Sequence, residues 1–372
     1  MANQNFSNKM PKKDNSIFTE KSLQFINEYL NNASPAGFEA SGQKIWLDYI
    51  TPFIDHYLID NYGNTVGIIN PKAKFKVVIE AHADEISWMV KFISADGFIS
   101  VIGNGGMDPQ IALGKTVNIH TENGIVQGVF GWPAIHKREP GKDAHPKTKM
   151  LWIDVGAKNK KDIEKLGIEI GNVCTYAEGF QVLNHGYWIG RAMDNKMGGV
   201  IIAEVARLLK ESKTKLPFGL YIVNAVQEEV GLNGASMIVE TIEPDMAIVT
   251  DVTHDTCTPN IEMKIEGEVY CGKGPAIMIA PSVHQTVLKL IKQTAKNSKI
   301  PFQLEACSPE TGTDTDAFAY GNCGVPSALI SLPLRYMHTS VEMLHQQDVE
   351  NCILLILETL KNIDIDAKFT WK

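Results

Sequence analysis

The sequence predicts an α/β protein in which a mostly parallel sheet is covered by helices on both faces and a small β-rich domain is inserted. Apolar strand-like runs alternate with helical patterns in two separate segments of the chain. Near-continuous apolar strands in such alternation are typical of a sheet buried on both faces. Between the two segments, short β-type runs are separated by glycine-rich turns. The length of 372 residues also favours two packed units over one core.

The first α/β segment is predicted to span residues 1–90. Apolar residues at helical spacing predict helices around Ser22–Leu30 and Ala40–Ile50. An apolar run over Lys76–Glu80 predicts a buried strand that leads directly into Ala81 and His82. This segment therefore supplies the first strand of the sheet and its first metal-type side chain.

The inserted domain is predicted to span residues 91–185. Its β-type runs include Phe98–Ile102, Thr116–His120 and Gly124–Phe130, each bounded by turn residues. This texture differs from the alternation of strands and helices on either side of it. We therefore expect a compact β domain between the two halves of the α/β domain.

The second α/β segment is predicted to span residues 186–372, where the alternation of strands and helices returns. A strong helix is expected first, because apolar residues recur at helical spacing after Asn195. The predicted helices are Asn195–Lys210, Ser236–Ile242, Val283–Ala295 and Val349–Leu360, and the predicted strands are Phe218–Val226, Met246–Thr250 and Ser327–Leu332.

Composition narrows the possible functions. The chain carries a net charge of −8 with a pI near 5.7, which argues against a nucleic-acid partner because binding to phosphates depends on Lys and Arg. No apolar stretch is long enough to span a membrane, and the polar N-terminus lacks the apolar core of a signal peptide. The six scattered cysteines are expected to be reduced thiols. We therefore expect a cytoplasmic protein.

Metal-type side chains follow apolar runs at several distant positions of the chain. In open α/β sheets, ligands bind beyond the carboxyl ends of the strands, so side chains at these positions are expected to meet at one edge. Oxygen and imidazole ligands suit a hydrolytic divalent metal, and one spare glutamate could serve as general base. The residues are His82, Asp194, Glu229, Asp251 and His338, with Glu228 as the spare glutamate.

Each of these residues alone has an ordinary structural explanation. Asp194 could be a helix N-cap, and the pair Glu228 and Glu229 could be a solvated turn. Together, these explanations do not account for so many costly polar groups at one sheet edge, because buried charges persist mainly when they are paired or metal-bound. The set as a whole therefore predicts a two-metal hydrolase.

Five segments, in the order AHADE, GRAMDN, VQEEVG, TDVT and LPLRYMHT, resemble the glutamyl-aminopeptidase family of co-catalytic metallopeptidases, which includes the tetrahedral TET aminopeptidases. The resemblance runs from about Pro35 to Val349 and includes GGMDPQIALGKTVNIH in the inserted domain. It implies a zinc-exopeptidase-like α/β fold whose insertion is a small β-barrel or PDZ-like dimerisation domain.

The resemblance also implies a role for each metal-type residue. Asp194 would bridge two divalent metal ions. His82 and Asp251 would complete one metal site, and Glu229 and His338 would complete the other. Zinc or cobalt is the expected metal, with manganese as a further possibility, because the same nitrogen and oxygen ligands accept all three.

Two more residues receive roles in catalysis. Glu228 would be the general base that takes a proton from the attacking water and passes it to the leaving amine. Asp84, two residues after His82, would hold the second nitrogen of that imidazole and orient it. The expected activity is removal of N-terminal residues from short peptides with a free amino group.

The substrate pocket is the least determined part of the site. His254, Thr313, Asp314 and Arg335 are predicted to contact substrate, although His254 could equally be an ordinary core or surface histidine. Where relatives carry a GTDA loop, this chain has the more polar SPETGTDTDAF. The preferred first residue of the peptide therefore stays open among acidic, aliphatic and basic side chains.

Three other functions compete with the aminopeptidase as explanations of this sequence. A deacylase or dipeptidase would keep the metal site and change the pocket. A glucanase is disfavoured, because its two carboxyls would have to face each other roughly 5–9.5 Å apart, whereas Glu228 and Glu229 are adjacent. A non-catalytic scaffold would not need Glu228.

Assembly is predicted from the resemblance alone. Dimers formed through the inserted domain would build a tetrahedral shell of twelve subunits that admits only short peptides. The alternative is that the insertion is a lid on a monomer or dimer.

Overall fold

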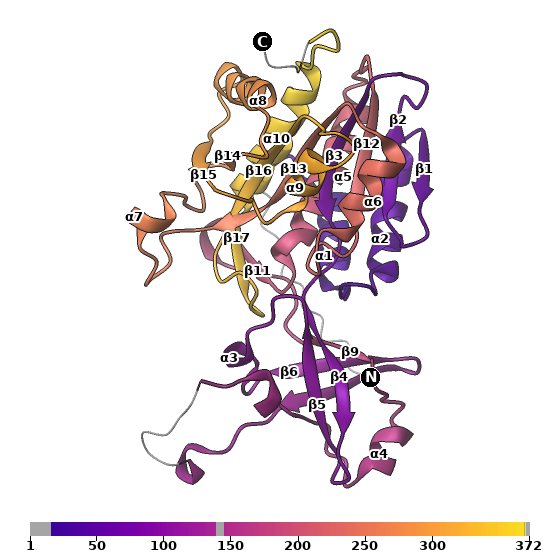
Figure 1. Cartoon of the computed structure of the whole chain (residues 1–372), viewed down its shortest axis with the longest axis vertical. Helices are drawn as coiled ribbons and strands as arrows, with labels where there is room; N and C mark the ends of the chain where they lie inside the picture. The colour runs from indigo at the N-terminus through magenta and orange to yellow at the C-terminus, as the bar shows by residue number, and fades with distance from the viewer. Residues whose placement is uncertain (1–15, 139–144, 368, 370–372) are drawn as a thin grey trace.

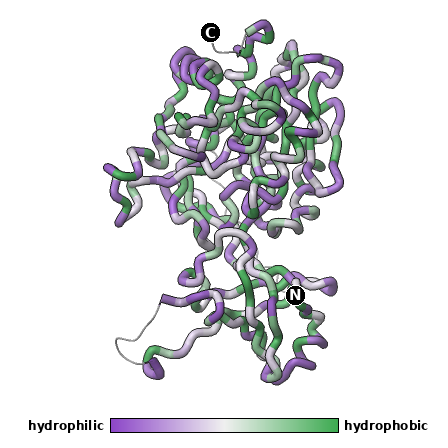
Figure 2. The backbone as a smooth tube through the Cα atoms, viewed as in Figure 1, coloured by the Kyte–Doolittle hydropathy of each residue, from purple (hydrophilic) through white to green (hydrophobic). Residues whose placement is uncertain are grey.

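The computed structural model describes residues 16–138, 145–367 and 369. It has two lobes: an α/β body and, below it in Figure 1, a smaller β lobe joined to the body by several chain segments. The hydrophobic strands gather at the centre of the α/β body in Figure 2, while hydrophilic segments lie mostly on its outside. The predicted α/β fold with a small inserted barrel is confirmed.

The α/β body is built on one sheet of eight strands in the order β1-β2-β12-β3-β13-β16-β14-β15. The four strands from β12 to β16 pair in parallel, and β14 and β15 form a further parallel pair. The other pairings are antiparallel, so the sheet is mixed. The strands are β1 His56–Ile59, β2 Thr65–Ile69, β3 Lys76–His82, β12 Gly219–Ala225, β13 Met246–His254, β14 Ala276–Ile279, β15 Gln303–Ala306 and β16 Ser327–Leu334.

Helices cover both faces of this sheet (Figure 1). On one face α5 packs on β3 and β13 and against α10, α1 and α2, while on the other face α9 packs on β13 and β16 and against α6. The burial of apolar side chains by both layers explains why the central strands are apolar on both sides. The helices of the body are α1 Glu20–Asn31, α2 Ala40–Ile50, α5 Met193–Glu211, α6 Asn233–Ile242, α7 Met263–Glu266, α8 Gln285–Asn297, α9 Asp314–Tyr320 and α10 Gln346–Lys361, with the 3-10 turn η1 Thr51–Phe53.

The β lobe is a closed barrel in the order β4-β5-β8-β7-β6-β9. Its own core is separate from the core of the body and is centred on Trp88, Ile119 and Phe130. The strands are β4 Ser87–Ile93, β5 Phe98–Asn104, β6 Thr116–Thr121, β7 Gly124–Phe130, β8 Ile153–Asp154 and β9 Val173–Tyr176. The barrel also carries α3 Pro109–Ala112, α4 Lys160–Lys165 and the 3-10 turns η2 Ile135–Lys137 and η3 Thr148–Met150.

A third, three-stranded sheet lies at the base of the body. Its strands are β10 Gln181–Val182, β11 Tyr187–Gly190 and β17 Glu342–His345, with the 3-10 turn η4 Asn184–Gly186 between β10 and β11. The pairing of β11 with β17 is antiparallel and sets Gly190 opposite Glu342. This pairing brings the segment before Asp194 next to the segment after His338.

The elements differ from the sequence expectation mainly at their ends. The strand expected over Lys76–Glu80 continues to His82, and the strand expected over Met246–Thr250 continues to His254. Asp251 therefore lies within a strand rather than after one. The first barrel strand begins at Ser87, whereas the sequence predicts a boundary after residue 90, because β4 extends across that point with an irregularity in its pairing between Val90 and Phe92.

None of the six cysteines forms a disulfide, and all of them lie in the described part of the chain. Within those same residues, no helix is long and apolar enough to cross a membrane. The polar N-terminus, residues 1–15, lies outside the described residues, and the cytoplasmic location stays a prediction.

Candidate active site

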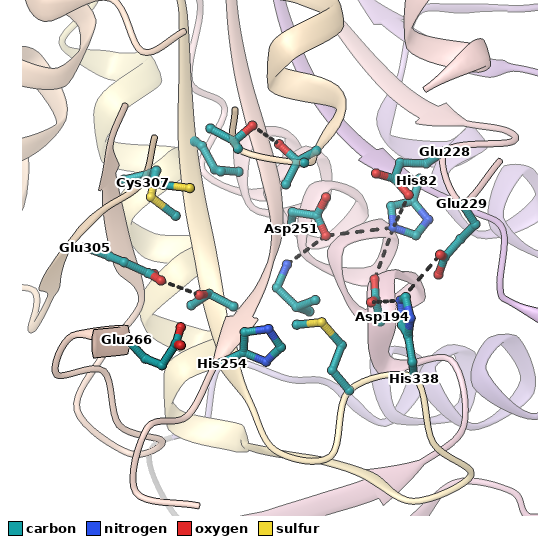
Figure 3. A pocket seen from close by; sticks show the side chains of 18 of the residues that line it. His82, Asp194, Glu228, Glu229, Asp251, His254, Glu266, Glu305, Cys307 and His338 are labelled. Carbon is teal, nitrogen blue, oxygen red and sulfur yellow. Dashed lines mark hydrogen bonds and ion pairs between the residues drawn. The ribbon is translucent and has the colours of Figure 1, made fainter. Parts of the chain in front are cut away.

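The metal-type residues come together at the carboxyl edge of the central parallel strands. His82 is the last residue of β3, Asp251 lies near the end of β13, and Glu228 and Glu229 follow β12. In Figure 3 all of these side chains point into one cavity, together with Asp194 from the start of α5 and His338 from the loop after β16. The parallel register of β12, β3 and β13 brings these distant residues to the same place.

Asp194 lies between the two imidazoles. Its Oδ1 is 3.2 Å from Nε2 of His82, and its Oδ2 is 3.4 Å from Nε2 of His338. Its two oxygens therefore face two different clusters of ligand-type atoms. Asp194 and Asn195 depart from helical φ and ψ within α5, which turns the Asp194 carboxylate toward the cavity instead of along the helix.

The remaining carboxylates surround these two imidazoles. Asp251 Oδ1 and Glu228 Oε2 are each 3.8 Å from Nε2 of His82. On the other side, Glu229 Oε2 is 3.5 Å from Nε2 of His338. Two groups of ligand-type atoms, each within 4.8 Å of one another, result: His82 with Glu228 and Asp251, and His82 with Asp194 and Glu229.

The carboxylates in this cluster repel one another in a buried environment. Burial, with the nearby Asp251 charge, raises the pKa of Glu228 to about 9, and burial with Asp194 raises that of Asp251 to about 7. Burial and Asp194 also raise the pKa of Glu229 well above its usual range.

The surroundings of His82 and Asp194 instead favour the charged form of each side chain. Burial alone would lower the pKa of His82, but Glu228, Asp194 and Asp84 raise it well above its usual range. Burial opposes ionisation of Asp194, yet hydrogen bonds with His338 and His82 hold the pKa of Asp194 below its usual range. The cluster thus holds more carboxyl groups than its two imidazoles can balance in ionised form.

Asp84 lies behind His82 and the turn that carries the glutamates. Its Oδ1 is 3.3 Å from Nδ1 of His82. The same carboxylate accepts hydrogen bonds from the backbone N–H groups of Glu228, at 3.0 Å, and Glu229, at 3.1 Å. Asp84 is completely buried, so one side chain fixes both the imidazole and the glutamate turn.

Glu342 supports the site from the opposite side and was not identified from the sequence. One of its carboxylate oxygens accepts from the backbone N–H of Asp194 at 3.1 Å, and the other accepts from that of His338 at 2.8 Å. Glu342 is 2% exposed and lies at the start of β17. Its position in an edge strand, four residues after a histidine, carries no sequence signal of this role.

The barrel reaches the site through one loop. His338 Nδ1 lies 3.1 Å from the carbonyl oxygen of Gly106, in the loop after β5. A Cβ at this glycine would lie 2.6 Å from His338 Nδ1, closer than real contacts allow. The glycine therefore permits the close approach that orients the imidazole.

Two of the four predicted substrate residues line the cavity, which has a volume of about 410 Å³: His254 and Thr313. Asp314 and Arg335 do not line it. Asp314 is buried under the site, beside Glu80, and burial followed by the Glu80 charge raises its pKa well above its usual range. Arg335 instead donates a 2.6 Å hydrogen bond to the carboxylate of Asp255.

The cavity contains two acidic residues that sequence reasoning missed, Glu266 and Glu305. Glu305 comes from β15 and Glu266 from the end of α7, two elements that the sequence interpretation did not include. The pairing of β15 with β14 at the sheet edge places Glu305 across from Met278. A strand of only four residues, in which polar and apolar residues alternate, gave little signal that Glu305 would line a cavity.

The cluster fits divalent cations. It combines four carboxylates with two imidazoles, the ligand types that hydrolytic metal ions prefer. In addition, Oε1 of Glu229 is buried without a hydrogen-bond partner in the described part of the chain. Cations at this position would satisfy that oxygen and balance the negative charge.

An α/β sheet with carboxylates and imidazoles gathered at its carboxyl edge is the arrangement of a metal-dependent hydrolase. Comparison with known proteins identifies the family. The family model described as M42 glutamyl aminopeptidase matches residues 63–355. The chain belongs to this family, whose members are metal-dependent, and it is a peptide hydrolase.

Individual relatives agree with this assignment. The chain is 32% identical over 347 residues to the lysyl aminopeptidase of Pyrococcus furiosus, covering 92% of this chain and 98% of that protein. A TET aminopeptidase from the marine sediment archaeon Thaumarchaeota archaeon SCGC AB-539-E09 has a TM-score of 0.89 and 29% identity, with 93% of this chain and 97% of that chain covered. The Pyrococcus horikoshii TET1 peptidase, which can assemble into a tetrahedron or a large octahedral shell, has a TM-score of 0.82 and 26% identity, with 92% and 100% covered.

Proposed function

We propose that this protein is a two-metal aminopeptidase that removes N-terminal residues from short peptides. The observation that carries the proposal is the position of Asp194, whose two oxygens face His82 and His338 separately. A carboxylate in that position can be shared by two cations. His82 and Asp251 would hold one of them, and Glu229 and His338 the other.

The metal ions supply part of the chemistry. When bound, two divalent cations would polarise the scissile carbonyl, lower the pKa of the attacking water and offset the repulsion among the carboxylates. The sequence and the ligand types leave zinc, cobalt and manganese open, with zinc or cobalt expected.

Glu228 is proposed as the general base. It lines the cavity with one tenth of its side chain exposed, and its backbone is held by Asp84. From there its carboxylate would take a proton from the attacking water and return it to the leaving amine. Glu229, whose carboxylate lies toward His338, is left as a ligand. The adjacent glutamates thus have different roles because their side chains face different imidazoles.

Asp84 is proposed as a positioning residue. Its contact with His82 Nδ1 leaves Nε2 free to face the cavity, which fixes the imidazole for binding a cation. Glu342 would position Asp194 and His338 through their backbones in the same way.

Assembly into a closed shell is also proposed. The TET structures that this chain resembles include one that forms a tetrahedron or an octahedral shell. The barrel of this chain carries exposed apolar side chains that suit a subunit contact, among them Phe92, Phe98 and Ile125. A shell would confine hydrolysis to short peptides.

Replacing Glu228 tests the mechanism. Glu228→Gln should keep both cations while kcat falls by about 10²–10⁴-fold, because only the base is lost. Metal content by mass spectrometry and turnover of an aminoacyl-p-nitroanilide are measured on the same sample. Asp194→Ala is the matched comparison and should lose metal as well as activity. Wild-type turnover in Glu228→Gln would refute the assignment of the base.

A further inference from the structure

The cavity has a second acidic region away from the metal-type cluster. In Figure 3, Glu305 and Glu266 lie on the far side of the cavity from His82 and His338. Both residues line the same cavity as the proposed metal ligands. A group bound at the cluster could therefore extend toward these two carboxylates.

Within the described part of the chain, only one of the two carboxylate oxygens of Glu305 has a hydrogen-bond partner. Its Oε1 accepts a 2.7 Å hydrogen bond from the Thr253 hydroxyl on β13. Its Oε2 is buried and has no hydrogen-bond partner in the described residues. An unpaired carboxylate oxygen at this depth is costly, so the site favours a ligand that supplies hydrogen-bond donors or positive charge.

No lysine or arginine among the described residues lines the cavity to neutralise Glu305. The nearby loop that carries His338 includes Arg335, but the Arg335 guanidinium is bound to the buried Asp255. Glu266, which is exposed, adds a second negative charge at the cavity rim. The far region of the cavity therefore holds two carboxylates, with no lysine or arginine among the described residues that line it.

The same cavity also has an apolar surface. Met278, Leu329 and Met337 line it, from β14, β16 and the loop before His338. A lysine or arginine side chain combines an aliphatic stem with a charged end, so it matches both parts of this lining.

We propose that this cavity is the subsite for the first side chain of the peptide and that it selects lysine or arginine through Glu305. The inference rests on the proposed aminopeptidase activity, in which the peptide's amino group and scissile bond lie at the metal cluster. The side chain would extend over Met278 and Leu329 to the Glu305 carboxylate. Glu266 would add long-range attraction from the rim.

The competing side chains fit less well. An acidic first residue would bring a carboxylate next to Glu305 and Glu266. An aliphatic one would cover Glu305 Oε2 without pairing it, which leaves a buried charge uncompensated. Selection is thus expected to come both from attraction of basic side chains and from exclusion of acidic and aliphatic ones.

The test compares lysyl and norleucyl p-nitroanilides, which differ mainly in the terminal ammonium. The metal-loaded wild-type protein should show a kcat/KM ratio that favours lysine by at least about tenfold. Glu305→Gln should lower this ratio at least about tenfold, with lysine hydrolysis falling and norleucine hydrolysis rising, because a buried charge partner is removed. Glu305→Lys should move the preference toward glutamyl-p-nitroanilide.

Two controls separate a specific contact from a general effect of charge. Glu266→Gln should lower the ratio less than about fivefold, since an exposed carboxylate contributes little. Glu240→Gln, an exposed glutamate on α6, should leave the ratio unchanged. A wild-type preference for norleucine or glutamate, or an unchanged ratio in Glu305→Gln, would overturn the inference while leaving the aminopeptidase proposal intact.

Binding of free amino acids tests the subsite without any hydrolysis of substrate. Titration of the metal-loaded protein with free L-lysine and L-norleucine in a calorimeter should show at least about tenfold tighter binding of lysine, lost in Glu305→Gln. This result in a protein that hydrolyses no substrate would support the cation subsite and refute the proposed activity. Equal binding of both amino acids would refute the subsite.

Discussion

Asp194 and Glu228 show how much of a site depends on where single oxygen atoms lie. Asp194 faces both imidazoles, while Glu228 and Glu229, although adjacent in sequence, face different ones. The sequence identified all three residues by type and by their position after strands or before a helix. It could not show which oxygen faces which nitrogen, because that depends on the local backbone.

The residues around the cluster were harder to predict. Asp84 was expected to hold His82, and its 3.3 Å approach agrees with that role, but its hydrogen bonds to the glutamate turn were not foreseen. Glu305 and Glu342 were not identified because each lies on a strand of only four residues, which is too short for its pattern of apolar and polar residues to be recognised. The sequence of such a strand does not show whether a polar residue in it is exposed or buried, because that depends on the elements packed against it.

Arg335 is expected to stabilise the fold rather than to bind substrate. Since its guanidinium holds Asp255, which is completely buried and also accepts from the backbone N–H groups of Cys257 and Cys271, Arg335→Gln should affect stability. We expect a loss of about 1–3 kcal/mol, seen as a lower melting temperature.

The KM for a short substrate separates this structural role from the substrate contact expected from the sequence. With Arg335 outside the cavity, KM should change by less than about twofold in Arg335→Gln. A large rise in KM at unchanged melting temperature would restore the role in substrate binding.

At the scale of elements, the long and strongly apolar segments were the most predictable. The central strands and the helices α2, α5 and α10 were expected close to their observed positions, since hydrophobic periodicity is strongest in long elements. The hairpin of β1 and β2 was missed. Its strands have only four and five residues, β1 is largely exposed, and Gly67 interrupts the apolar residues of β2.

The small sheet of β10, β11 and β17 was missed for a different reason. Its strands are short and distant in sequence, and only their pairing makes them a unit. That pairing sets Glu342 beside the segment that leads to Asp194. An element without a recognisable pattern thus positions two of the proposed metal ligands.

The barrel is the element on which assembly is proposed to depend. We expect the wild-type protein to elute as a shell of about 490 kDa in size exclusion coupled to light scattering, twelve times the chain mass of 41.1 kDa. Phe92→Asp places a charge on an exposed apolar position of β4, and it should shift the protein to smaller species.

Lys165→Asp, at an exposed position of α4 in the same barrel, is a charge-changing control and should leave the mass unchanged. A metal-loaded wild-type monomer at micromolar concentration would contradict the assembly. The barrel would then be better explained as a lid on a single subunit.

In the molecule as a whole, the fold determines where the site forms and which residues surround it. The parallel strands carry His82, Asp251 and the glutamate turn to one edge, and both lobes contribute to the surroundings of His338. The fold class followed from the alternation of elements. The antiparallel strands at both sides of the sheet did not, because strand direction depends on connections between weak elements.

The most direct test of the proposed function is hydrolysis of a panel of aminoacyl-p-nitroanilides by metal-stripped protein, with and without added zinc or cobalt, beside an N-acetylated control. We expect activity only with metal and only on substrates with a free amino group, with the lysyl substrate preferred. Hydrolysis of the N-acetylated control would favour a deacylase. Activity that is unaffected by verified removal of metal, or no hydrolysis of any substrate in the panel with both metals bound, would contradict the proposal that this protein is a two-metal aminopeptidase.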